Sequence, residues 1–112
     1  MKLSEAIQSL SALAQETRLG IFRALVQAGA DGLPAGRIAE AVGAPSSTLS
    51  FHLKELAHAG MVDSQQAGRF VIYTANFATM NALLGFLTEN CCGGNPCSPV
   101  CTPACSTEKE ST

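Results

Sequence analysis

The chain has 112 residues and a formal net charge of -2. This length suits a single domain of ordinary size, and the charge excludes the large excess of Lys and Arg that is typical of proteins held to nucleic acid by charge alone. Residues 1–88 contain six basic and six acidic side chains, while the remaining residues contain one Lys and three Glu. Any binding to DNA by this neutral domain must therefore rely on a few well-placed contacts and on doubling of the site in a dimer.

The composition changes sharply after about residue 90, where Gly, Pro and Cys become frequent. We therefore expect a folded domain over residues 1–90 and a flexible, cysteine-rich tail over residues 91–112. The N-terminal stretch lacks the apolar core of a signal peptide, and no stretch is long enough to cross a bilayer, so we expect a cytoplasmic protein without a membrane partner. Thiols stay reduced in the cytoplasm, which favours ligand binding over structural disulfides for the five cysteines.

Two helices are expected at the start of the chain. The first covers residues 4–14, with Ser4 as its N-cap and an apolar stripe that contains Ile7 and Leu10. The second covers residues 16–28, has a broad apolar face that includes Leu19, and stops at Gly29.

A helix-turn-helix is expected next. Pro34 suits the start of a short helix over residues 35–42, which Gly43 ends. After the turn, the sequence SSTLSFHLKELAHAG carries leucines at helical spacing and stops at Gly60. Two helices that are joined by a glycine-bearing turn are typical of this motif.

The period then changes to two residues, which predicts a β-hairpin that turns at Ala67 and Gly68 into the strand RFVIYT. Helical spacing returns from Phe77 and ends near Asn90. The predicted fold is mainly α with a small β-hairpin: a homodimeric winged helix-turn-helix in which four helices are followed by the two strands of the hairpin and a fifth helix.

The helix over residues 46–59 is the candidate reader of DNA, because the major groove admits one helix and a few of its side chains reach the bases. With the leucines inward, Ser46, Ser47, Ser50 and Lys54 point outward, and Thr48, Phe51 and His52 flank them. The candidate DNA-binding residues are Ser46, Ser47, Thr48, Ser50, His52, Lys54 and Arg69.

Four of these residues have an alternative interpretation. Ser46, which stands where an N-cap belongs, or Ser47 could only cap the helix. His52 precedes a core leucine, so its ring could be hydrogen-bonded at the edge of the core. Arg69 follows the hairpin turn, where it could bind the minor groove or a phosphate, or stay solvated.

The segments SSTLSFHLKELAHAGMV and QQAGRFVIYTA resemble the recognition helix and wing of the ArsR/SmtB metalloregulatory repressors, and SALAQETRLGIFRAL resembles their second helix. The resemblance covers about residues 5–90. It implies a homodimer, built from the first and last helices, that binds an inverted repeat in double-stranded operator DNA and leaves when a metal or metalloid arrives. The helix AGRIAEAV lacks the Cys-x-Cys pair of the best-known arsenic sensors.

The inducer site must then lie elsewhere, and the soft ligands of the chain are its five cysteines. A trivalent ion such as As(III) or Sb(III) takes up to three thiolates on one side, which Cys91, Cys92 and Cys97 can supply across a Gly-Gly turn. The stretch ENCCGGNPC also resembles a subgroup of arsenic repressors whose sensing thiols follow the last helix. Cys101 and Cys105 have no clear counterpart.

Other functions stay open at this point. Cys97, Cys101 and Cys105 are separated by three residues each, within the loose range of Zn(II) ligands, so a Zn(II)- or Cd(II)-responsive repressor is an alternative. A trivalent organoarsenical would need Cys91 and Cys92 alone, and a redox role is a further alternative. An enzyme is not expected, because no phosphate cradle or acid/base pair accompanies the thiols. A winged helix used for protein contacts alone, or a metal-carrying adaptor, would explain the neutral charge.

Overall fold

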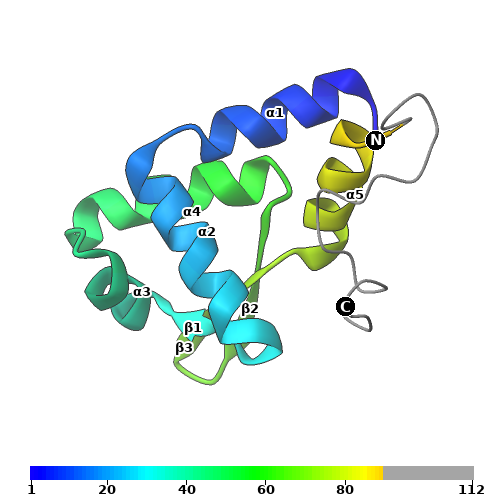
Figure 1. The fold of residues 1–112 in the computed structure, drawn as a ribbon. Coiled ribbons are helices and arrows are strands. Elements are labelled where there is room, and N and C mark those ends of the chain that lie inside the picture. The colour runs from blue at the N-terminus through cyan, green and yellow to red at the C-terminus, as the bar shows by residue number, and fades with distance from the viewer. Residues whose placement is uncertain (90–112) are drawn as a thin grey trace, which may run out of the picture.

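The structure, a computed structural model, describes residues 1–89, and the predictions for residues 90–112, including the boundary of the tail and the cysteine site, lie outside this part of the chain. The elements follow in the order α1 (Leu3–Leu13), α2 (Glu16–Ala28), η1 (Gly29–Asp31, a 3₁₀ turn), β1 (Leu33–Pro34), α3 (Ala35–Val42), α4 (Ser46–His58), β2 (Val62–Ala67), β3 (Phe70–Ala75) and α5 (Phe77–Leu87) (Figure 1). The mainly helical fold with a wing is confirmed.

Local signals explain where the helices begin and end. The backbone N–H of Arg18 donates to the Gln15 side chain (2.9 Å), and that of Thr79 donates to the Asn76 side chain (2.9 Å), so both α2 and α5 begin with a polar cap. α3 ends at Gly43, whose φ of +68° is a left-handed conformation that glycine adopts at little cost.

The helices pack around a single apolar cluster. Ile21 and Leu25 of α2, Ile38 of α3, Leu56 of α4 and Met61 are all fully buried in it. Burying a side chain of this size stabilises the folded state by about 1.5–3 kcal/mol. These contacts hold α3 and α4 against α2 and so fix the angle between the two helices of the turn motif.

Three strands form one antiparallel sheet in the order β1-β3-β2. The predicted β2–β3 hairpin is present and runs from the pair Val62 and Ala75 to the pair Ala67 and Phe70. Its turn lies at Gly68 and Arg69, one residue later than predicted. The sequence did not predict β1, which pairs Leu33 with Tyr73. Gly32 is required beside it, because a Cβ there would lie 2.4 Å from the Tyr73 carbonyl oxygen.

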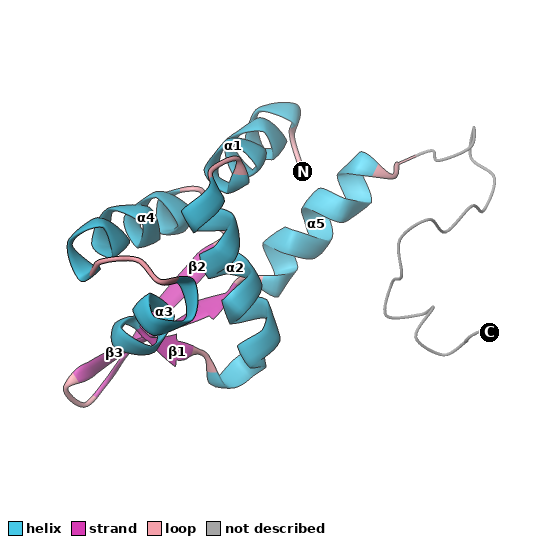
Figure 2. Ribbon diagram, turned by 60° about the vertical axis from the view of Figure 1, so that its left-hand side comes forward, coloured by secondary structure: helices cyan, strands magenta, loops and turns pink. Residues whose placement is uncertain are grey.

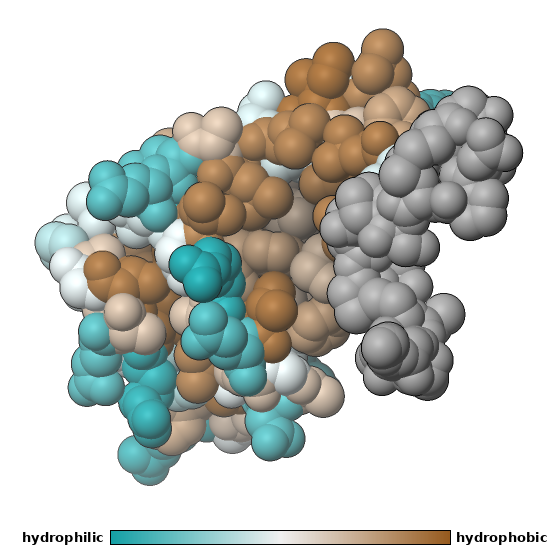
Figure 3. Space-filling view, viewed as in Figure 1, coloured by the Kyte–Doolittle hydropathy of each residue, from teal (hydrophilic) through white to brown (hydrophobic). Residues whose placement is uncertain are grey.

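The first helix differs from its prediction. It begins at Leu3, not after a Ser4 cap, and the backbone N–H of Lys2 donates to the Glu5 carboxylate (2.8 Å). Its buried side chains are small, whereas the apolar stripe with Ile7 (54% exposed) and Leu10 (42%) faces outward. Figure 3 shows apolar side chains gathered along α1 on this face.

The last helix also ends earlier than predicted, at Leu87 instead of near Asn90. Phe77, Met80 and the buried Leu83 pack its first turns onto the rest of the chain, while Leu87 is 54% exposed. Figure 2 shows α5 projecting from the body beside α1. None of the helices within residues 1–89 has the length and hydropathy that a membrane span requires.

Candidate DNA-binding surface and sensor site

The helix-turn-helix consists of α3, the turn from Gly43 to Pro45, and α4. Figure 2 shows the N-terminal end of α4 and the tip of the β2–β3 hairpin on the side of the molecule away from α5. This arrangement leaves one helix and one hairpin free to approach the same partner.

The N-terminus of α4 has no side-chain cap. Pro45 is the N-cap, and no side chain accepts from the first N–H groups, so the interpretation of Ser46 or Ser47 as the cap is wrong. Proline fits because its fixed φ suits the entry to a helix and its missing N–H costs nothing there. The carbonyl oxygen of Pro45 accepts from the Thr48 hydroxyl (3.1 Å). The backbone N–H of Thr48 donates to the same carbonyl oxygen (3.2 Å), so the N–H groups of Ser46 and Ser47 are the ones left to attract an anion such as a DNA phosphate.

The outward face of α4 is mostly polar, as the sequence predicts. The three leucines of the helix are buried, with at most 3% of each side chain exposed. The exposed residues of the predicted set on this helix are Ser46, Ser47, Thr48, Ser50 and Lys54. Hydroxyl and amino groups of this kind are suited to hydrogen bonds with phosphates and base edges.

His52 is half-buried and makes a contact that the sequence could not identify. Its Nδ1 lies 3.2 Å from Nη1 of Arg18, and Nε of Arg18 donates to the carbonyl oxygen of Ala12 (2.7 Å). Because a guanidinium has only donors, Nδ1 is the acceptor in this contact. His52 thus has the hydrogen bond at the edge of the core that the alternative interpretation expects, and its contact with DNA stays a prediction.

Sequence reasoning left Phe51 out of the candidate set, although its ring is 57% exposed on α4. It lies one helical turn from Ser47 and from Lys54, so it belongs to the outward face. The spacing of four and three residues was the signal that could have found it.

The wing presents Arg69 at its turn. Gly68 has a φ of +63°, which closes the hairpin, and its carbonyl oxygen accepts from the side chain of Gln66 (2.8 Å). Arg69 is exposed, so its guanidinium is free to extend toward a phosphate or into a groove.

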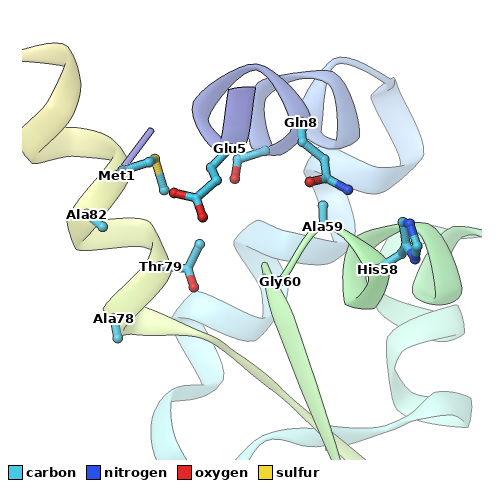
Figure 4. A pocket seen from close by; sticks show the side chains of 10 residues that line it. Met1, Glu5, Gln8, His58, Ala59, Gly60, Ala78, Thr79 and Ala82 are labelled. Atoms are coloured by element: carbon cyan, nitrogen blue, oxygen red, sulfur yellow. The ribbon is translucent and has the colours of Figure 1, made fainter. Parts of the chain in front are cut away.

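A hollow of about 420 Å³ lies between α1, the end of α4 and α5. Figure 4 shows the side chains of Glu5 and Thr79 pointing into it from opposite walls, with Gln8 above Ala59 and His58 at one edge. The two outer helices thus leave an open hollow between them at this level.

The predicted sensor residues Cys91, Cys92 and Cys97 lie outside the described residues. Within residues 1–89, no three side chains of His, Cys, Asp or Glu come together in a way that could hold a metal ion.

A family profile for a helix-turn-helix domain matches residues 13–65. Comparison of the sequence with curated proteins found no match. Among solved structures, an ArsR-like transcriptional regulator from Rhodococcus sp. RHA1 is similar at 28% identity and a TM-score of 0.68, over 77% of this chain and 78% of that one.

Two further structures share the fold. NolR from Sinorhizobium fredii is 31% identical over 77% of this chain and 83% of that one, with a TM-score of 0.61. A homodimeric winged helix-turn-helix DNA-binding domain from Mycobacterium bovis, described as a possible ArsR-family transcriptional regulator, is 25% identical over 83% of this chain and 86% of that one, with a TM-score of 0.62.

Proposed function

The chain belongs to the ArsR family of winged-helix, DNA-binding transcriptional regulators, and we propose that it is a repressor that binds operator DNA as a homodimer and leaves it when As(III) binds Cys91, Cys92 and Cys97. The fold and family are those of transcriptional regulators and not of enzymes.

The observation that carries the repressor assignment is the free polar face of α4. Its first N–H groups have no side-chain cap, and Ser47, Ser50 and Lys54 are exposed beside them. These groups provide phosphate and base contacts from one helix, and Arg69 on the wing adds a cation at a second point.

The dimer is supported by the outward stripe of α1. Leu3, Ile7 and Leu10 are 42–65% exposed, and Leu87 of α5 is 54% exposed. Exposed apolar side chains that gather on one helix mark a surface for association. A two-fold dimer through α1 and α5 would cover these side chains and present two copies of α4 to an inverted repeat.

The choice of inducer is supported by the chemistry of the donor set. All five cysteines of the chain lie between residues 91 and 105, and Cys91 follows the last residue of α5 by four positions. Thiolates are soft ligands that select soft ions. Three thiolates suit a trivalent metalloid, whereas adjacent cysteines are awkward for a tetrahedral Zn(II) site.

The route from the tail to the DNA passes through α5. An ion captured beyond Leu87 would shift α5, and the hollow between α1, α4 and α5 gives that helix room to move. Such a shift changes the spacing between the two α4 helices of the dimer. Coupling energies of about 1–3 kcal/mol are usual, and they correspond to an operator affinity lower by about 5- to 150-fold.

A titration tests the proposal. Labelled DNA from the region upstream of the gene is followed by anisotropy under reducing conditions while As(III), Sb(III), Zn(II) or Cd(II) is added. We expect release by As(III) from the wild type and no release from Cys91→Ser with Cys92→Ser, although that variant binds DNA normally.

The matched control is Cys101→Ser with Cys105→Ser, which should still respond to As(III). Full release of the Cys91/Cys92 variant by arsenite would rule out this site. Release by Zn(II) or Cd(II) alone would favour these ions as the inducers. Release of the Cys97→Ser variant by a trivalent organoarsenical would show that Cys91 and Cys92 are sufficient. Absence of any DNA shift at low salt would favour a protein-binding role.

A further inference from the structure

The largest apolar side chain exposed on the DNA-facing helix is Phe51. Leu49, Leu53 and Leu56 of α4 are at most 3% exposed, whereas Phe51 is 57% exposed. Contact with a partner would remove the exposed apolar area of this ring from water, which favours association at this position.

The stripe proposed for dimerisation does not include Phe51. That stripe belongs to α1 and α5, whereas Phe51 lies one turn from Ser47 and Lys54 on the outward face of α4. The ring therefore lies among the side chains that the proposed function directs at DNA.

The ring is also held in place from one side. The imidazole of His52 meets it edge to face, with ring centroids 5.5 Å apart and an angle of 63° between the planes. His52 is itself bound to Arg18, which is anchored on the carbonyl oxygen of Ala12. His52 and Arg18 are positioning residues that limit the orientations open to Phe51.

In the major groove, the one apolar group on a base edge is the 5-methyl group of thymine. We propose that Phe51 packs on such a methyl group and so sets a preference for thymine at one position in each half-site. This inference rests on the proposed DNA-binding function, and it adds a residue that determines specificity to the hydroxyl and amino groups beside it.

Replacement of thymine by deoxyuridine tests the contact, because it removes the methyl group and keeps every hydrogen-bonding group. In a bound upstream fragment, each pair of symmetry-related thymines is replaced in turn. Burial of one methyl group strengthens binding by about fourfold, so replacing both thymines of the contacted pair should weaken DNA binding by the wild type by about 15-fold. With Phe51→Ala, that penalty should vanish, and with Phe51→Leu it should be kept in part.

The matched control is Phe70→Ala, because Phe70 on the wing is 64% exposed and should not affect the penalty at this thymine. His52→Ala should reduce the penalty without removing it, since the ring of Phe51 then has more freedom. Unchanged circular dichroism shows that the variants fold. Tight binding with no deoxyuridine penalty, or a penalty that persists in Phe51→Ala, overturns the contact but not the repressor; failure of the wild type to bind any fragment overturns both.

Discussion

Arg18 connects α1 and α4, two helices whose relative orientation matters for the proposed function. Its side chain reaches the end of α1 through Ala12 and the middle of α4 through His52, which is 34 residues away in the sequence. Since α1 belongs to the proposed dimer surface and α4 to the DNA surface, this one side chain couples the orientation of α4 to that of the dimer surface.

Replacing Arg18 by Gln should remove both hydrogen bonds. Each is worth about 0.5–1.5 kcal/mol, so the free energy of unfolding should fall by about 1–3 kcal/mol in urea denaturation. Operator affinity, measured by anisotropy, should fall as well. In a double-mutant cycle with His52→Ala we expect a coupling energy of about 0.5–1.5 kcal/mol.

A control variant on the same helix provides the check on this interpretation. Arg23→Gln, on the exposed side of α2, removes the same charge and should change neither the free energy of unfolding nor the operator affinity. A coupling energy near zero in the cycle with His52→Ala would mean that the contact between Arg18 and His52 does not contribute to stability.

At the level of the element, α1 has two faces with different sizes of side chain. Ala6, Ser9 and Ala12 are buried within the subunit, whereas Ile7 and Leu10 are left outside. Small residues let α1 approach α2 and α4 closely, and the large ones remain for a partner.

Placing Glu at Ile7 or Leu10 should therefore separate the dimer while the subunit stays folded. A charge buried in an interface without a partner costs several kcal/mol. Because both subunits carry the change, the dissociation constant should rise by at least about 100-fold in sedimentation equilibrium. Operator affinity should fall with it.

Leu19→Glu is the matched control, since Leu19 is 44% exposed, close to the value for Leu10, but lies on α2. If Leu19→Glu dissociates the dimer and the two α1 variants do not, the interface lies elsewhere on the molecule.

The helices also show what the sequence could predict and what it could not. The bounds of α2 and α3 are marked by residues directly next to each helix, such as Gly29 after α2 and Pro34 and Gly43 around α3, and both were predicted to the residue. The stripe of α1 has helical spacing whether it faces the core or a second subunit, so its direction could not be read. Pairing of β1 with Tyr73 and the contact between Arg18 and His52 join distant segments, and no local pattern encodes them.

For the molecule as a whole, the charge balance limits how DNA can be held. Residues 1–88 carry six basic and six acidic side chains, and among them Lys54 of α4 and Arg69 of the wing are the cations assigned here to DNA. A dimer then offers four such cations, far fewer than a basic protein of this size would offer.

The affinity for DNA should therefore depend weakly on salt. Each phosphate contact contributes about -0.9 to the slope of log K against log salt, so four contacts give a slope of about -3.6. Arg69→Ala should make the slope shallower by about 2, because the dimer loses two contacts. Lys2→Ala, which removes a cation at the far end of α1, should leave it unchanged. A wild-type slope as steep as about -8 would require twice the number of phosphate contacts, and the binding surface would then have to extend beyond α4 and the wing.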